Sequence, residues 1–242
     1  TEYSNPLTRE LLLKESREMV ETYKNTPGLL LFLLGNEKVN IKFFQKPGFI
    51  KSIIYSFFRS TKAKRSFDYA NYLEEHNIPT PFPIAFVEER NAIGLLGNSY
   101  YICEQINYDF TIRELIHNPQ FPERKTILEQ FAAFTFKMHE AKINFLDHSP
   151  GNTLIVNEGN GRYKFYLIDL NRMRFENLSI EKRMDNFKKM WLSKLMVQIV
   201  SKKYAQLSHL PEAKLHAILM EKTQNFKRKT ARKKFLKRKI GK

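Results

Sequence analysis

The chain contains 242 residues, of which 42% are apolar and 27% are charged. This is the composition of an ordinary globular protein, and the length is sufficient to bury a core in one domain or in two lobes. The single cysteine, Cys103, excludes a disulfide-stapled secreted scaffold and indicates a reducing compartment. The apolar run Leu29–Leu34 falls far short of the roughly 18 residues that a membrane-spanning helix needs. We therefore expect a cytoplasmic protein.

The formal net charge of +16 is concentrated near the end of the sequence. Residues 222–242 contain 11 lysines and arginines and no acidic residue, whereas the rest of the chain has 30 basic and 25 acidic residues. Basic segments of this kind bind phosphate-rich surfaces, either nucleic acid or the anionic face of a membrane. Phe226 and Phe235 interrupt the basic residues, which favours a helix on a membrane surface. A solvated helix that only aids solubility is the alternative.

Strands dominate the elements predicted for the first half. Strand-like runs cover residues 29–34, 39–44, 84–88 and 99–105. A turn-rich segment at 35–38 is expected to join the first two strands. Residues 1–27 and 61–76 are predicted to be helical, the latter with Ala63, Phe67, Ala70 and Leu73 on one face. Cys103 lies in an apolar strand, and we expect a buried thiol.

Helices dominate the second half. Thr111 and Glu114 match a capping box at the start of a helix. Asn160 and Gly161 form a dipeptide typical of a hairpin turn, because both residues tolerate a positive φ. The hairpin strands are expected at 153–157 and 163–168, and the helices at 123–141 and from 179 onward.

Together these elements predict an α+β fold with two lobes. The boundaries that we expect are a β-rich N-lobe over 1–106, a mostly helical C-lobe over 107–221 and a basic tail over 222–242.

The segment 147–152, which reads DHSPGN, has the spacing of a phosphotransferase catalytic loop. Asp147 can accept a proton from an attacking hydroxyl, and the side-chain oxygen of Asn152 can coordinate Mg²⁺. The intervening Pro150 and Gly151 provide the tight turn that lets both side chains face the same space. The adjacent His148 is interpreted as a bystander to the chemistry.

Two further residues fit phosphoryl transfer. Asp169 ends the strand 163–168, where its carboxylate is positioned to hold a metal ion. Lys42 alternates with apolar neighbours on an early strand and is the expected phosphate-binding lysine. Its acidic partner is expected on the helix 61–76, with Asp68 as the candidate and Glu74 and Glu75 as alternatives.

With these motifs, the sequence resembles bacterial lipopolysaccharide core kinases. The resemblance covers about residues 36–205 and is carried by the stretches 62–70, 77–85, 147–152 and 167–175. It implies a protein-kinase-like fold and the phosphorylation of 3-deoxy-manno-octulosonic acid (Kdo) or heptose on a lipid A–core precursor. It also implies ATP and Mg²⁺ as cofactors.

The resemblance assigns roles to individual residues. Asp147 is the catalytic acceptor, Asn152 and Asp169 are the metal ligands, and Lys42 is the ATP lysine. Glu104 and Ile106 bound the hinge whose backbone groups bind adenine.

Three positions depart from the family pattern. Phe145 stands where the family commonly has a histidine, Ser66 stands where the helix glutamate is expected, and Asn171 replaces a glycine of the metal motif. An impaired pseudokinase that binds a partner or a membrane is therefore an alternative, as is a small atypical protein kinase.

We expect an ATP-dependent kinase of the lipopolysaccharide inner core that works in the cytoplasm, peripheral to the inner membrane. Arg172 and Arg174 follow Asp169 and are candidates to bind a sugar carboxylate or phosphate, because guanidinium presents a fork that matches such anions. The basic tail is expected to bind the anionic membrane surface, and no specific nucleic acid is expected as a partner.

Overall fold

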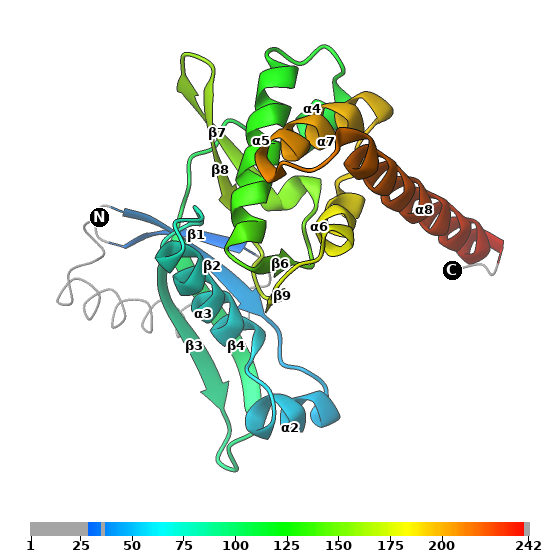
Figure 1. Ribbon diagram of the computed structural model, residues 1–242. Coiled ribbons are helices and arrows are strands. Elements are labelled where there is room, and N and C mark those ends of the chain that lie inside the picture. Colours follow the sequence, from blue (N-terminus) through cyan, green and yellow to red (C-terminus); the bar gives the residue numbers. More distant parts are fainter. Residues whose placement is uncertain (1–28, 35–36, 240–242) are drawn as a thin grey trace. The chain divides into compact units, whose positions relative to one another are not determined.

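The computed structural model describes residues 29–34 and 37–239, and the chain forms two compact units. Unit 1 consists of the residues up to Asn107 together with Asp169–Asn171, and unit 2 consists of Tyr108–Ile168 and the residues from Arg172 onward. The predicted mixture of helices and strands is confirmed (Figure 1). The helix expected over 1–27 lies outside the described residues.

Unit 1 is built on a four-stranded antiparallel sheet in the order β1-β2-β4-β3. The strands are β1 (Leu29–Leu34), β2 (Glu37–Phe44), β3 (Pro83–Arg90) and β4 (Leu96–Glu104). Alternation along the strands buries Val39, Ile41 and Ile102 in one core cluster. The four predicted strands are confirmed, but Glu37 and Lys38, which were expected in the turn, already belong to β2.

Helix α3 (Lys62–Glu75) packs against β3 and β4 and confirms the helix predicted over 61–76. Thr61 caps its start, since the Thr61 hydroxyl accepts a hydrogen bond from the Lys64 amide at 3.0 Å. The buried face of the helix includes Ala63, Ala70 and Leu73. Cys103 is buried in β4 as expected, and burial raises the pKa of its thiol to about 12.

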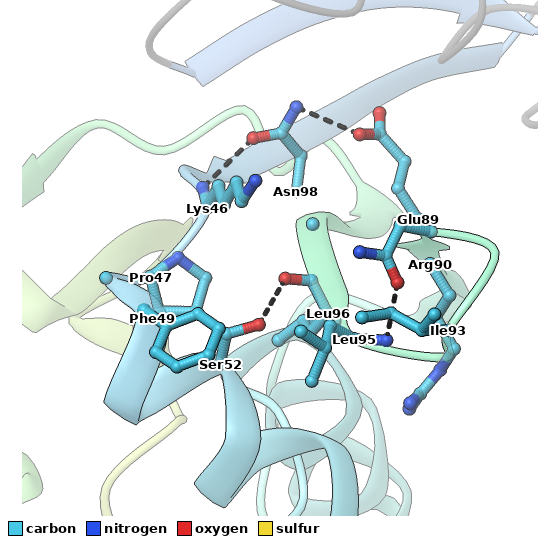
Figure 2. A pocket seen from close by; sticks show the side chains of 13 residues that line it. Lys46, Pro47, Phe49, Ser52, Glu89, Arg90, Ile93, Leu95, Leu96 and Asn98 are labelled. Atoms are coloured by element: carbon cyan, nitrogen blue, oxygen red, sulfur yellow. Dashed lines mark hydrogen bonds between the residues drawn. The ribbon is translucent and has the colours of Figure 1, made fainter.

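Helix α2 (Phe49–Phe57) was not among the predicted elements, and its orientation is unusual. Two serines face the sheet: the Ser52 hydroxyl donates to the Leu96 carbonyl at 2.7 Å, and the Ser56 hydroxyl accepts from the Leu96 amide at 2.8 Å. Figure 2 shows the first of these bonds beside the hollow that Ser52 lines. The large apolar side chains of the helix therefore point to solvent.

Unit 2 contains a three-stranded sheet in the order β5-β7-β8, a two-stranded sheet of β6 and β9, and a set of helices. Its strands are β5 (Phe110–Thr111), β6 (Ile143–Phe145), β7 (Thr153–Gly159), β8 (Arg162–Leu167) and β9 (Met173–Phe175). Its α-helices are α4 (Ile112–His117), α5 (Arg124–Glu140), α6 (Ile180–Asn186), α7 (Lys194–Ser208) and α8 (Glu212–Lys239), and its 3₁₀ helices are η2 (Pro150–Asn152) and η3 (Phe187–Met190). Helix α7 packs against both α5 and α8 (Figure 1).

Two local predictions for unit 2 are confirmed. Thr111 and Glu114 form the expected capping box at the start of α4. Asn160 and Gly161 adopt φ angles of 51° and 70° in the turn between β7 and β8. The turn fixes the hairpin that follows the segment 147–152.

The described basic residues from 222 onward belong to a longer helix. Helix α8 runs without a break through residue 222, where charge alone marked the start of a tail. Its first half is anchored in unit 2, since Leu215, Leu219 and Thr223 are buried. Within the described ranges, no helix is both long and apolar enough to cross a bilayer.

Candidate active site

Unit 1 brings together two residues that lie far apart in the sequence. The Lys42 ammonium forms an ion pair with the Asp169 carboxylate, with Nζ 2.5 Å from Oδ1. The pair depends on strand alternation: Val39 and Ile41 are buried on one face of β2, while Asn40 and Lys42 lie on the other. The Asn171 side chain also donates to Asp169 Oδ1, at 2.7 Å.

The backbone at Asp169 is strained. Its φ angle is 60°, which lies in the left-handed region that few residues other than glycine adopt. Such a conformation costs on the order of 1–3 kcal/mol and is found preferentially at functional sites. Asp169 follows shortly after the end of β8, and this backbone conformation lets its carboxylate contact Lys42.

The predicted hinge is held by side chains of unit 1. The Gln105 side-chain nitrogen Nε2 donates to the Ile106 carbonyl at 2.9 Å. The Gln105 side-chain oxygen Oε1 accepts a hydrogen bond from Asn40 Nδ2 at 2.9 Å. The Glu104 amide donates to the Phe82 carbonyl at 2.9 Å. These bonds fix the segment 104–106 at the end of β4.

Unit 2 holds Asp147 between two cations. Lys189 Nζ and Arg172 Nη1 lie 2.9 Å and 3.1 Å from the same oxygen, Asp147 Oδ1. Lys189 also donates to the Leu146 carbonyl at 2.6 Å. Among the contacts of the described residues, both cations bond to Oδ1, and no bond to Asp147 Oδ2 is found.

Asn152 is oriented by the same loop. Its side-chain nitrogen donates to the Asp147 carbonyl at 2.9 Å, which directs the amide oxygen away from that bond. Its own carbonyl accepts from the Ile168 amide at 3.1 Å, so the loop is tied to the end of β8. The short helix η2 supplies the tight turn that the residues Pro150 and Gly151 predict.

A buried asparagine braces this loop from α6. Asn186 Nδ2 donates to the Phe145 carbonyl at 2.8 Å and to the Asn144 side chain at 3.0 Å. Its oxygen lies 2.8 Å from His148 Nδ1, so that nitrogen must carry the proton. His148 is thus a fully buried part of the loop's support, and burial lowers its pKa to about 4.

The expected Lys42–Asp68 pair is not what the structure contains. Asp68 pairs with Lys64 one helical turn away, with Nζ 2.9 Å from Oδ2, and Lys42 pairs with Asp169 instead. The local (i, i+4) pair forms because both side chains lie on the same face of α3. Arg174 is exposed on β9, and Arg172 contacts Asp147.

Neither Lys189 nor Asn186 stands out in the sequence as a site residue. Lys189 is one of 41 lysines and arginines, and no motif surrounds it. Asn186 lies in a helical segment whose pattern says nothing about a loop about 40 residues earlier. Only the packing of α6 and η3 reveals either contact.

The residues fit a magnesium nucleotide by chemistry. Asp169 offers a carboxylate and Asn152 an amide oxygen, and Mg²⁺ prefers such hard oxygen donors together with phosphate oxygens and water. No cluster of three His, Cys, Asp or Glu side chains that would form a self-sufficient metal site occurs in the part of the chain that the structure describes.

Comparison with known proteins agrees with this chemistry. The sequence profile of the lipopolysaccharide kinase (Kdo/WaaP) family matches residues 44–210. A search of curated proteins found no significant match. Among solved structures, the chain is similar to one described as WaaP in complex with acyl carrier protein, with a TM-score of 0.63 and 16% identity, covering 92% of this chain and 97% of that chain. At this identity the likeness concerns the fold alone.

Proposed function

The chain belongs to the lipopolysaccharide kinase (Kdo/WaaP) family, and from this premise we propose that it transfers phosphate from ATP to a sugar hydroxyl of the lipopolysaccharide inner core. The acceptor sugar is Kdo or heptose. The reaction takes place in the cytoplasm, at the inner surface of the membrane that carries the lipid A–core precursor.

One observation carries the proposal. Lys42 and Asp169 are 127 residues apart in the sequence. Each is expected on separate grounds to bind a magnesium nucleotide, Lys42 through the phosphates and Asp169 through the metal ion. Their pairing at 2.5 Å, with Asp169 in a strained left-handed conformation, supports a common site for both. A structural ion pair on a surface would not require backbone strain.

Bound Mg²⁺–ATP supplies the phosphoryl group and neutralises its developing charge. Lys42 would bind phosphate oxygens of the nucleotide, Asp169 would be one ligand of the metal ion, and Asn152 is proposed as another. The Glu104 carbonyl and the Ile106 amide bind adenine. Positioning and electrostatics of this kind account for most of the catalysis in phosphoryl transfer.

Asp147 acts on the acceptor. Its Oδ2 orients the sugar hydroxyl and accepts its proton, while Lys189 and Arg172 hold the carboxylate through Oδ1. Arg174 contributes positive charge near Arg172 for an anionic sugar group. The exposed basic half of α8 keeps the enzyme near the anionic membrane surface.

The proposal is tested by incubating the enzyme with Mg²⁺, ATP and Kdo–lipid A and measuring phosphate on the acceptor by mass spectrometry. We expect Asp147→Ala, Asp169→Ala and Lys42→Met each to lower turnover on the order of 10³-fold or more. Lys202→Ala, on the exposed side of α7, is the matched control. Near-normal turnover by both aspartate variants would overturn the assignment.

A catalytically impaired binding module is the second candidate. The buried Phe145 and Ser66 favour it, because a phenyl ring cannot replace the family's imidazole and a hydroxyl cannot replace its carboxylate. Mg²⁺-dependent ATP binding without phosphate transfer to any core acceptor would identify this function.

A further inference from the structure

A hollow of about 600 Å³ lies beside the catalytic loop within unit 2. Arg113 of α4, the loop residue Gly151, Lys189, Trp191 and two residues of α8, Phe226 and Lys234, line it. Lys189 also holds Asp147, so the hollow begins one side chain away from the proposed proton acceptor.

The lining has the charge of an anion site. Arg113, Lys189 and Lys234 contribute three cations, and no acidic side chain is among the described residues that line the hollow. Arg113 is seated closely against the loop: a Cβ added to Gly151 would lie 2.6 Å from Arg113 Nη2. Any larger residue at Gly151 would therefore displace this guanidinium.

Trp191 forms an aromatic wall in a strained conformation. Its φ is 55°, which is rare for a bulky residue, and its side chain remains 38% exposed. Its ring meets Phe226 edge to face, with centroids 5.6 Å apart. Leu192, which follows Trp191, is also held in place, because the Lys227 side chain donates to its carbonyl at 2.7 Å. The structure thus holds an exposed apolar ring beside three cations.

We propose that this hollow is the acceptor subsite and binds an anionic sugar. The cations bind its carboxylate or a phosphate substituent, and the C–H face of the ring lies on Trp191. The inference rests on the proposed function and names the residues that select the substrate.

The experiment uses Trp191 as its own reporter, because the chain contains no other tryptophan. The full chain, without ATP, is titrated with Kdo, inorganic phosphate or uncharged mannose while tryptophan fluorescence is recorded. Saturable quenching by Kdo or phosphate, but not by mannose, is expected, and the two anions distinguish carboxylate from phosphate recognition. No response to either anion overturns the proposal.

Variants locate the binding site. Arg113→Ala and Lys234→Ala should weaken Kdo binding about tenfold or more and raise the KM for Kdo–lipid A, with the KM for ATP unchanged. Lys202→Ala should match the wild type. Lys234 is exposed on α8, so its variant tests the site even if Arg113→Ala fails to fold. Unchanged affinity in the Lys234 variant contradicts the assignment, whereas Kdo binding without phosphate transfer contradicts only the proposed function.

Helix α2 supports a second inference from unit 1 alone. Its serines face the sheet, and Phe49, Ile50 and Phe57 are 71%, 74% and 65% exposed. Phe58, directly after the helix, is 82% exposed, and Ile93, which lines a hollow with Phe49, is 73% exposed (Figure 2). Apolar groups gathered in this way mark an interaction surface.

The charges beside this surface indicate its partner. Residues 45–60 include Lys46, Lys51 and Arg59 and contain no acidic residue. Glu88 and Glu89 of β3 lie nearby, but Glu88 pairs with Arg90 and Glu89 accepts hydrogen bonds from Asn98 and Tyr100. An apolar helix whose own segment carries only cations matches the boundary between anionic headgroups and acyl chains. We infer that α2, with Phe58 and Ile93, inserts into an anionic lipid surface.

Quenching by bromine-labelled acyl chains tests the insertion directly. In a Trp191→Phe background, Phe58→Trp should be quenched by brominated phosphatidylglycerol vesicles and should remain bound at high salt. In the otherwise native chain, Phe57→Ser with Phe58→Ser should lower vesicle partitioning about tenfold or more, whereas the exposed Leu195→Ser should not. Absent quenching, or an α2 surface that instead pairs two copies in sedimentation, overturns the inference.

Discussion

Asp147 Oδ1 accepts hydrogen bonds from Lys189 and Arg172, which directs the other oxygen toward the acceptor. Lys189→Met keeps the length of the side chain but removes the charge and both bonds. We expect kcat to fall about 10- to 100-fold, because the carboxylate loses one of its two anchors, while the KM for ATP stays unchanged. Steady-state kinetics against both substrates measures this. The neighbouring Lys188 pairs with Asp185, so Lys188→Met is the control, and equal kcat in the two variants contradicts the role.

His148 links the catalytic loop to pH. Burial lowers its pKa to about 4, below the ordinary value of 6.5, so the folded state binds fewer protons than the unfolded state between these values. Stability is therefore lost as pH falls from about 6.5 toward 4, by about 1.4 kcal/mol per pH unit. Burial lowers the pKa of His139 to about 3, which adds a loss of the same sign.

Urea unfolding at a series of pH values measures this slope. His148→Gln should flatten it by about 1.4 kcal/mol per pH unit near pH 5. An identical slope in wild type and His148→Gln would show that the buried ring does not titrate as expected.

The sequence predicts Asp147, Asn152, Asp169 and Lys42 because local spacing or strand position distinguishes each of them. The pairing of Asp169 with Lys42, rather than Asp68, depends on contacts that no local pattern contains. His148 looked like a bystander because its burial and its bond to Asn186 come from the packing of α6. Local pattern thus singles out candidate residues, whereas the contacts that they make depend on packing.

At the level of elements, long periodic segments were predictable and short ones were not. Strands of two or three residues, such as β5, β6 and β9, are too short to show alternation. Helix α2 has no side-chain cap at Gly48 and turns its serines inward, the reverse of an ordinary amphipathic helix. Because of these two features, neither a capping residue nor the hydrophobic periodicity of the sequence indicates this helix.

Helix α8 combines an anchored part and a free part, and truncation separates them. A chain ending after Thr230 retains the buried Leu215 and Leu219 and the contacts of Phe226 and Lys227, so its melting temperature should stay close to that of the intact chain. A chain ending before Glu212 should fail to fold, since each buried leucine contributes about 2–5 kcal/mol. Calorimetry of both truncations checks this. A large loss of stability in the longer chain contradicts the division.

At the scale of the whole molecule, the uneven distribution of charge is the feature that favours binding to an anionic membrane surface. The net charge of +16 comes mainly from the exposed half of α8. Reversing Lys233, Lys237 and Lys239 to glutamate should weaken binding to anionic vesicles strongly at low salt, at about 1 kcal/mol or more per residue. The difference should vanish at about 1 M salt, where charges are screened within roughly 3 Å. Vesicle sedimentation measures both, and salt-independent binding by the tail would contradict an electrostatic role.

The central claim is that this chain adds a phosphate to the lipopolysaccharide core. Mass spectrometry of lipid A–core from cells lacking the protein tests it most directly, with complementation by the wild type or by Asp147→Ala. We expect the core to lack one phosphate, which the wild type restores and the variant does not. A core of unchanged phosphate content, or full restoration by Asp147→Ala, would contradict it.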